Sequence, residues 1–442
     1  MKKRIVYFLL SCSFISSSFA QKNSILQNPK HKEVFRFKFI NNTIILPIAV
    51  NGTSLNFIID TGSQATLLLD SKLIDSLALK NKRVFTIKGL GENNDIKAVK
   101  STHNLLQLKS IQLNAVPLFI PITTSIDFSS SYGMAIHGMI GAALFKNFIV
   151  KINYSSKKIT FYDSAYFDKI KCRKCEVLPL TLKNDKPYIT IYQQEEKKKT
   201  ALKMLVDTGG GDAFWIFEDQ SNGIYIPKKN IIDFLGVGLN GTIYGKRAKF
   251  HQLSIGKYHF KKPIVSFPDS TAIDIKKYLA QGRNGSIGSR VLKRFNVIID
   301  YPNKRFSFKR NKHFKTPFYY NKSGINLIYN GKQIIADTIE KISNKTNDDN
   351  NETASVFTVE IEKVLVFKRV VNYTINHIRK GSPADKVGLQ NGDKLISIND
   401  KEAYNYSLEK INTILFHKKN ISLKIMRAGV LLNFKLILED EL

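Results

Sequence analysis

The chain has 442 residues, of which 43% are hydrophobic and 24% charged, and its formal net charge at pH 7 is +32. This composition excludes a disordered or fibrous protein, and the length exceeds that of one ordinary domain. After the first 20 residues no stretch is apolar for about 18 residues, so we expect no transmembrane segment. The lysines are spread over every segment, so we expect no nucleic-acid partner despite the charge.

The first 20 residues have the pattern of an export signal. A basic start (Lys2–Arg4) precedes the apolar run Ile5–Leu10, and a small-residue cleavage site ends at Ala20. We therefore expect residues 1–20 to be removed and the protein to be periplasmic or secreted. Residues 9–12 also resemble a lipoprotein cleavage site, so lipid attachment at Cys12 remains an alternative.

An internal repeat organises the next 300 residues. Two Asp-Thr-Gly tripeptides, at residues 60–62 and 207–209, are 147 positions apart, and each follows two hydrophobic residues. A Gly-x-Gly signal (residues 89–91 and 236–238) and an apolar-Gly signal (139–141 and 286–288) repeat at the same offset. Alternating runs around a turn at 155–157 predict a β-hairpin. We therefore expect two mainly β units, residues 21–165 and 166–315.

The repeated aspartates, Asp60 and Asp207, are candidate catalytic residues. Two facing carboxyl groups that share one proton can activate a water molecule and protonate a carbonyl oxygen, because like charges so close cannot both ionise. A single Asp-Thr-Gly is also an ordinary turn. Two copies with equally spaced downstream signals favour a shared catalytic site.

The residues beside each aspartate suit a supporting role. Thr61 and Thr208 carry hydroxyls that could brace one loop against the other. Gly62 and Gly209 allow a tight turn with backbone N–H groups near the carboxylate. Ser63 could donate a hydrogen bond to the outer oxygen of Asp60.

On these motifs the chain resembles the retropepsin-like aspartic peptidases over residues 35–312. The resemblance implies two β-barrel lobes on one chain, as in pepsin, with one aspartate from each lobe in a shared active site. It implies hydrolysis of polypeptide substrates without a cofactor or metal. It also implies glycine-rich flaps over the substrate, one in each lobe, at Gly89, Gly91, Gly236 and Gly238.

One departure from that family follows the second tripeptide. The family has Ser, Thr or Ala at the position of Ser63, whereas the second copy has Gly210. We therefore expect Asp207 to lack the partner that Ser63 gives Asp60. The alternative function is a noncatalytic peptide-binding or scaffold protein of the cell envelope with a decayed second lobe.

Four other side chains fit structural roles. Cys172 and Cys175 stand together before a strand-like run, and in an exported protein they predict a local disulfide. His137 has Asn284 as its repeat partner, and a catalytic histidine would not be so replaceable. Trp215 is expected in the core or in a pocket wall.

The last region, residues 316–442, resembles the PDZ domains of bacterial envelope proteases. The resemblance rests on residues 378–384, 387–389, 391–393 and 395–399, with an amphipathic helix predicted over 408–416. PDZ domains add a peptide to a sheet edge, and here the candidate groove residues are Gly324, Ile325 and Leu327. A polar insertion near 343–355 is expected to be a surface loop. We expect the whole protein to be a monomer.

Overall fold

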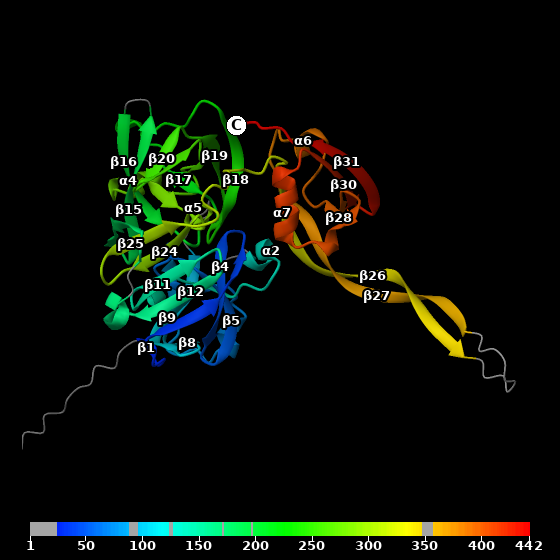
Figure 1. Ribbon diagram of the computed structural model, residues 1–442, viewed down its shortest axis with the longest axis horizontal. Helices are drawn as coiled ribbons and strands as arrows, with labels where there is room; N and C mark the ends of the chain where they lie inside the picture. The colour runs from blue at the N-terminus through cyan, green and yellow to red at the C-terminus, as the bar shows by residue number, and fades with distance from the viewer. Residues whose placement is uncertain (1–23, 88–95, 123–126, 170–171, 196–197, 347–356) are drawn as a thin grey trace, which may run out of the picture.

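A computed structural model describes residues 24–442 except 88–95, 123–126, 170–171, 196–197 and 347–356. It is mostly β, with two lobes side by side and a third unit beside them (Figure 1). Alternating or continuously apolar strands build each lobe, as expected from the sequence. None of the described helices is long and apolar enough to cross a lipid bilayer.

The first lobe is built on one large sheet and three short helices. Its strands run in the order β1-β9-β6-β10-β5-β4-β8-β7, with β3 beside β4. Their bounds are β1 Ser24–Leu26, β3 Lys38–Ile40, β4 Thr43–Val50, β5 Thr53–Ile59, β6 Thr66–Leu68, β7 Arg83–Ile87, β8 Ile96–Leu108, β9 Ile111–Pro121 and β10 Gly138–Ile140. The helices are α1 Leu73–Ser76, α2 Phe128–Tyr132 and α3 Ala142–Phe145.

The second lobe repeats this plan. Its sheet runs β18-β19-β22-β17-β23-β16-β15-β20-β21, with β14 beside β15. The strands are β14 Thr181–Lys183, β15 Lys186–Glu195, β16 Lys198–Val206, β17 Phe214–Ile216, β18 Asn230–Gly238, β19 Gly241–Lys249, β20 Gln252–Ile255, β21 Tyr258–Lys261, β22 Ile264–Pro268 and β23 Gly285–Ile287. The helical segments are η1 Ser164–Lys169 ahead of the lobe, then η2 Gln220–Asn222, α4 Ile275–Ala280 and α5 Ser289–Leu292.

A shared sheet joins the two lobes. It runs β13-β25-β24-β11-β12-β2, so β11 of the first repeat pairs directly with β24 of the second. The strands are β2 Lys32–Arg36, β11 Phe148–Asn153, β12 Lys158–Asp163, β13 Glu176–Pro179, β24 Phe295–Asp300 and β25 Arg305–Arg310. The expected hairpin is β11–β12, with its repeat in β24–β25. One buried apolar cluster runs through both lobes.

The third unit has its own core and one long ribbon. Its sheet runs β26-β27-β28-β30-β31. The elements are β26 Ile325–Thr346, β27 Phe357–Ile378, α6 Pro383–Lys386, β28 Lys394–Ile398, β29 Lys401–Glu402, η3 Ala403–Asn405, α7 Leu408–His417, β30 Asn420–Arg427 and β31 Val430–Ile437. The helix predicted over 408–416 is α7, and it lies between this sheet and the lobes (Figure 1).

The polar insertion corrects one expectation from the sequence. Residues 343–346, expected in a surface loop, continue β26 in register with β27. The two strands project away from the third unit as a two-stranded ribbon (Figure 1).

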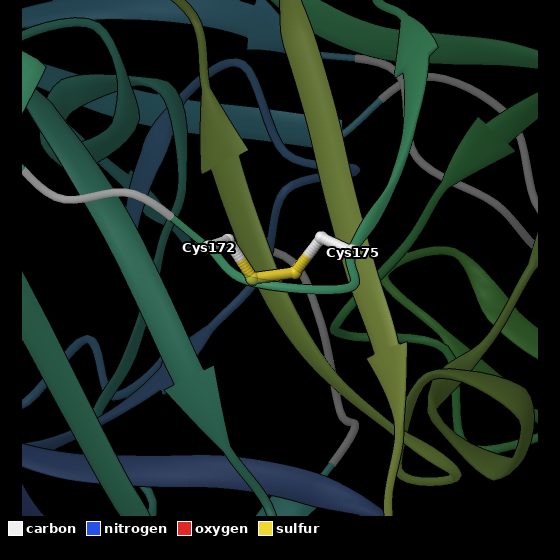
Figure 2. Close-up of a disulfide and its surroundings, with 2 residues drawn as sticks. All are labelled: Cys172 and Cys175. Atoms are coloured by element: carbon white, nitrogen blue, oxygen red, sulfur yellow. A yellow bond between two sulfur atoms is a disulfide. The ribbon is translucent and has the colours of Figure 1, made fainter.

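Cys172 and Cys175 form the expected disulfide, in the turn that precedes β13 (Figure 2). The bridge closes a loop of only a few residues, so it constrains this connection between the lobes locally. The predicted signal sequence and Cys12 lie outside the described residues.

Candidate active site

Asp60 and Asp207 occupy equivalent positions at the ends of buried strands. Each follows an apolar strand, β5 or β16, that runs parallel to the short strand β10 or β23. The N–H of Asp60 donates to the carbonyl of Ile140 at 2.9 Å, and the N–H of Asp207 donates to that of Ile287 at 2.9 Å. The repeat therefore fixes both aspartates in the same way.

The two threonines link the loops across the lobe boundary. The N–H of Thr61 donates to Oγ1 of Thr208 at 3.0 Å, and the N–H of Thr208 donates to Oγ1 of Thr61 at 3.0 Å. The Thr61 hydroxyl donates onward to the carbonyl of Val206 at 2.6 Å, and that of Thr208 to Ile59 at 2.8 Å. Both threonines are fully buried. Each loop thus completes the hydrogen bonds of the other.

The two carboxyl groups meet where the loops converge, and only glycine fits between them. A Cβ on Gly209 would lie 2.3 Å from Cγ of Asp60, and one on Gly62 would lie 3.0 Å from Oδ1 of Asp60 and 3.1 Å from Oδ1 of Asp207. Burial raises the pKa of Asp60 well above its ordinary value, and the nearby charge of Asp207 raises it further. Asp60 is therefore suited to hold a proton.

The two aspartates receive unequal numbers of backbone donors. Oδ1 of Asp207 accepts from the N–H groups of Gly209 at 3.0 Å and Gly210 at 2.8 Å, whereas Oδ1 of Asp60 accepts from Gly62 at 2.7 Å. Asp207 thus accepts two backbone hydrogen bonds where Asp60 accepts one. The two carboxyl groups are therefore not equivalent, as expected, but Asp207 rather than Asp60 has the larger number of hydrogen-bond donors.

The hydrogen bond expected from Ser63 is a wrong prediction. Its hydroxyl donates to the carbonyl of Ala65 at 2.7 Å rather than to Asp60. A serine hydroxyl readily satisfies itself on a nearby backbone carbonyl, and spacing along the chain does not reveal which rotamer it adopts.

His137 and Asn284 show why these repeat partners can differ in type. Nδ1 of His137 accepts from the N–H of Asn56 at 3.0 Å, and Oδ1 of Asn284 accepts from the N–H of Lys203 at 2.8 Å. Asn56 and Lys203 also stand 147 positions apart. Either side chain supplies an acceptor, so the role is structural.

A buried ion network beside Asp207 was not predicted. Nη1 of Arg247, on β19, contacts both oxygens of Asp212 at 2.9 Å, and its Nε donates to Asp233 at 2.7 Å. The indole of Trp215 donates to Asp212 at 3.0 Å. Although burial opposes its charge, Arg247 lowers the pKa of Asp212 below the ordinary value. The only signal for this network in the sequence was the acidic residue Asp212, which directly follows the three glycines at 209–211.

A cavity of about 1330 Å³ opens over the aspartates. Gly236 and Gly238 line it from the β18–β19 hairpin, and Trp215 contributes to its wall. In the first lobe β7 and β8 pair in the matching place, but Gly89 and Gly91 lie outside the described residues. The described chain brings no three His, Cys, Asp or Glu side chains together to hold a metal ion.

The candidate groove of the third unit borders the same cavity. Gly324 directly precedes the edge strand β26, and Ile325 and Leu327 lie at its start. All three line the cavity together with Phe416 of α7. Gly324 has φ of +78°, and a Cβ there would lie 2.2 Å from Oγ of Ser382. The site therefore needs glycine at this position.

The N–H groups of that loop already have acceptors. The N–H of Gly324 donates to Oδ1 of Asn321 at 3.2 Å, and that of Ile325 donates to Oγ of Ser323 at 3.1 Å. Capture of a terminal carboxylate by these two groups would displace those contacts. β26 is the edge strand of its sheet, and α2 of the first lobe packs beside it.

Two family models match separate parts of the chain. Residues 46–143 match the family model described as aspartyl protease, and residues 374–427 match that of the PDZ domain. The aspartic proteinase from Irpex lacteus aligns with a TM-score of 0.39 at 13% identity, over 64% of this chain and 99% of that one. No curated protein matches the sequence. The chain therefore contains an aspartyl protease domain followed by a PDZ domain.

Proposed function

We propose that this protein is an exported aspartic endopeptidase whose PDZ domain holds a substrate or partner peptide. The observation that carries the proposal is the meeting of Asp60 and Asp207 through the crossed hydrogen bonds of Thr61 and Thr208. Export rests on the pattern of residues 1–20. Because both aspartates come from one chain, a monomer suffices.

The proposed chemistry uses the difference between the carboxyl groups. Ionised Asp207 takes a proton from a water molecule, which attacks the peptide carbonyl. Protonated Asp60 donates to the carbonyl oxygen as charge develops on it. The raised pKa of Asp60 supports this assignment of the proton, as do the two N–H groups that donate to Asp207.

The geometry favours catalysis over the noncatalytic alternative. That alternative rested on Gly210, which was expected to leave Asp207 without a partner. Its backbone N–H nevertheless donates to Asp207 at 2.8 Å, so a glycine at this position supports the carboxylate.

Paired variants test the proposal. The mature chain, residues 21–442, is incubated with a peptide library, and products are identified by mass spectrometry. Asp60→Asn and Asp207→Asn are each expected to lower cleavage at least about 100-fold with an unchanged circular dichroism spectrum, because half a dyad cannot share a proton. Asp163→Asn is the control, since among the described residues this carboxylate accepts a hydrogen bond only from the N–H of Ala165.

Two outcomes would contradict the proposal. Comparable turnover by either dyad variant would remove the shared site. Absence of cleavage by the unaltered chain, together with no binding of a statine-type transition-state mimic, would favour the noncatalytic alternative.

A further inference from the structure

A lysine in the cavity of the dyad has no ion pair with an acidic side chain among the described residues. Lys186 is the first residue of β15, is half-buried and lines the cavity over Asp60 and Asp207. The neighbouring carboxylate does not neutralise it, because Asp185 pairs with Lys146 at 2.6 Å. The charges that act on Lys186 are those of Arg283 and the two aspartates.

Arg283 faces the same space from a fixed position. The residue is 7% exposed, and its guanidinium lies 4.7 Å from the ring centre of Tyr278 and 5.3 Å from that of Phe217. Nε donates to the carbonyl of Gly285 at 3.1 Å. Its two Nη groups have no acceptor within the described residues. The aromatic contacts and the Nε hydrogen bond do not use the edge of the guanidinium that carries the Nη groups. Arg283 is one of the residues that line the cavity.

Two neighbouring cations and a singly charged dyad leave this corner of the cavity with a positive excess. Burying a cation costs free energy unless an anion or hydrogen-bond acceptor compensates it. Burial lowers the pKa of Lys186, and Arg283 lowers it further, while the two aspartates oppose this effect. The dyad therefore compensates the pair only in part.

We propose that Lys186 and Arg283 form a subsite for a carboxylate side chain of the polypeptide substrate, next to the bond that is cleaved. The proposal rests on the endopeptidase function proposed above. The planar edge of Arg283 suits the two oxygens of a carboxylate, and the ammonium of Lys186 is a rotatable point charge. The substrates are thus polypeptides with Asp or Glu beside the scissile bond.

The test compares matched peptides that differ by one charge. In a cleaved peptide, each position flanking the bond is set in turn to Glu or Gln, and kcat/KM is measured for the mature chain. At one position Glu is expected to raise kcat/KM about 10- to 100-fold, as for a charge-assisted hydrogen bond. Lys186→Met is expected to remove this preference, so that the ratio of kcat/KM for the Glu peptide to kcat/KM for the Gln peptide falls to about 1.

Two further variants separate the subsite from other roles of a positive charge. Lys186→Glu is expected to make a Lys peptide preferred over a Glu peptide, which a lysine that merely tunes the dyad would not do. Lys203→Met is the control for the overall charge of +32, because Lys203 lies on the adjacent strand β16 and outside the cavity lining. It is expected to keep the full preference for Glu.

Peptide binding gives a readout that does not depend on cleavage. Fluorescence anisotropy with the Asp60→Asn variant is expected to show at least about 10-fold tighter binding of the Glu peptide, and the added change Lys186→Met should abolish the difference. Equal kcat/KM for Glu and Gln peptides would overturn the subsite and leave the endopeptidase standing. If the unaltered chain cleaves nothing, the endopeptidase fails, and equal affinities would then overturn the subsite separately.

Discussion

Replacing Thr208 with Val tests whether the crossed threonine bonds hold the two lobes together. The change keeps the shape of the side chain and removes its hydroxyl. The N–H of Thr61 then loses its acceptor at 3.0 Å, and the carbonyl of Ile59 loses its donor at 2.8 Å. Each buried polar group left without a partner costs about 1–3 kcal/mol. The free energy of unfolding of the lobes should therefore fall by about 2–6 kcal/mol.

Urea denaturation followed by the fluorescence of Trp215 measures this change, because the chain has one tryptophan and it lies in the second lobe. Thr66→Val is the matched control: Thr66 is 3% exposed, and its hydroxyl has no hydrogen bond within the described residues. The double variant Thr61→Val/Thr208→Val should lose less than the sum of the single losses, because the two residues share bonds. Equal losses for Thr208→Val and Thr66→Val would refute the reasoning.

Because the pKa of Asp60 is raised, the folded chain keeps a proton that the unfolded chain releases. The free energy of unfolding should therefore fall as the pH rises from the ordinary carboxyl range through the raised pKa of Asp60. Urea titrations at several pH values should show a shallower fall for Asp60→Asn, and parallel profiles would contradict this. Arg247→Met removes the buried cation of Asp212 and the closer of the two that pair with Asp233, and should cost about 3–5 kcal/mol in the same assay. Adding Asp212→Asn should restore part of that loss, and a harmless Arg247→Met would disprove the role of the network. Gly209→Ala should abolish peptide cleavage with little change in circular dichroism, because its Cβ would lie 2.3 Å from Cγ of Asp60; retained turnover would show that the loop can shift.

The repeat made most of the two lobes predictable. Its constant offset places β10 and β23, α3 and α5, and β11 and β24 at equivalent positions. The signal is strong because each strand-loop unit around the dyad needs apolar residues, an aspartate and a glycine at close spacing along the chain. The shared site of Asp60 and Asp207 was predicted from the two copies of this unit and from the resemblance to the retropepsin-like aspartic peptidases.

Long-range contacts and rotamers were the parts that sequence did not reveal. Arg247 meets Asp212 across 35 positions, and no local pattern marks that pair. The bond of Ser63 depends on a side-chain rotamer. The ribbon of β26 and β27 escaped prediction because polar residues such as Ser343 and Asn344 can occupy a solvent-exposed strand as well as a loop.

The pairing of β11 with β24 has a consequence for how the cleft meets its ligand. A peptide has a direction, whereas a cleft made from two identical halves would present the same wall to either orientation. Because one chain supplies both halves, and the pairing of β11 with β24 holds them together, their walls are free to differ. Lys186 lines the cavity in the second half, and Phe39, 147 positions earlier, lines it in the first. A cleft with a cation on one side and an aromatic ring on the other can distinguish the N-terminal from the C-terminal side of a bound peptide.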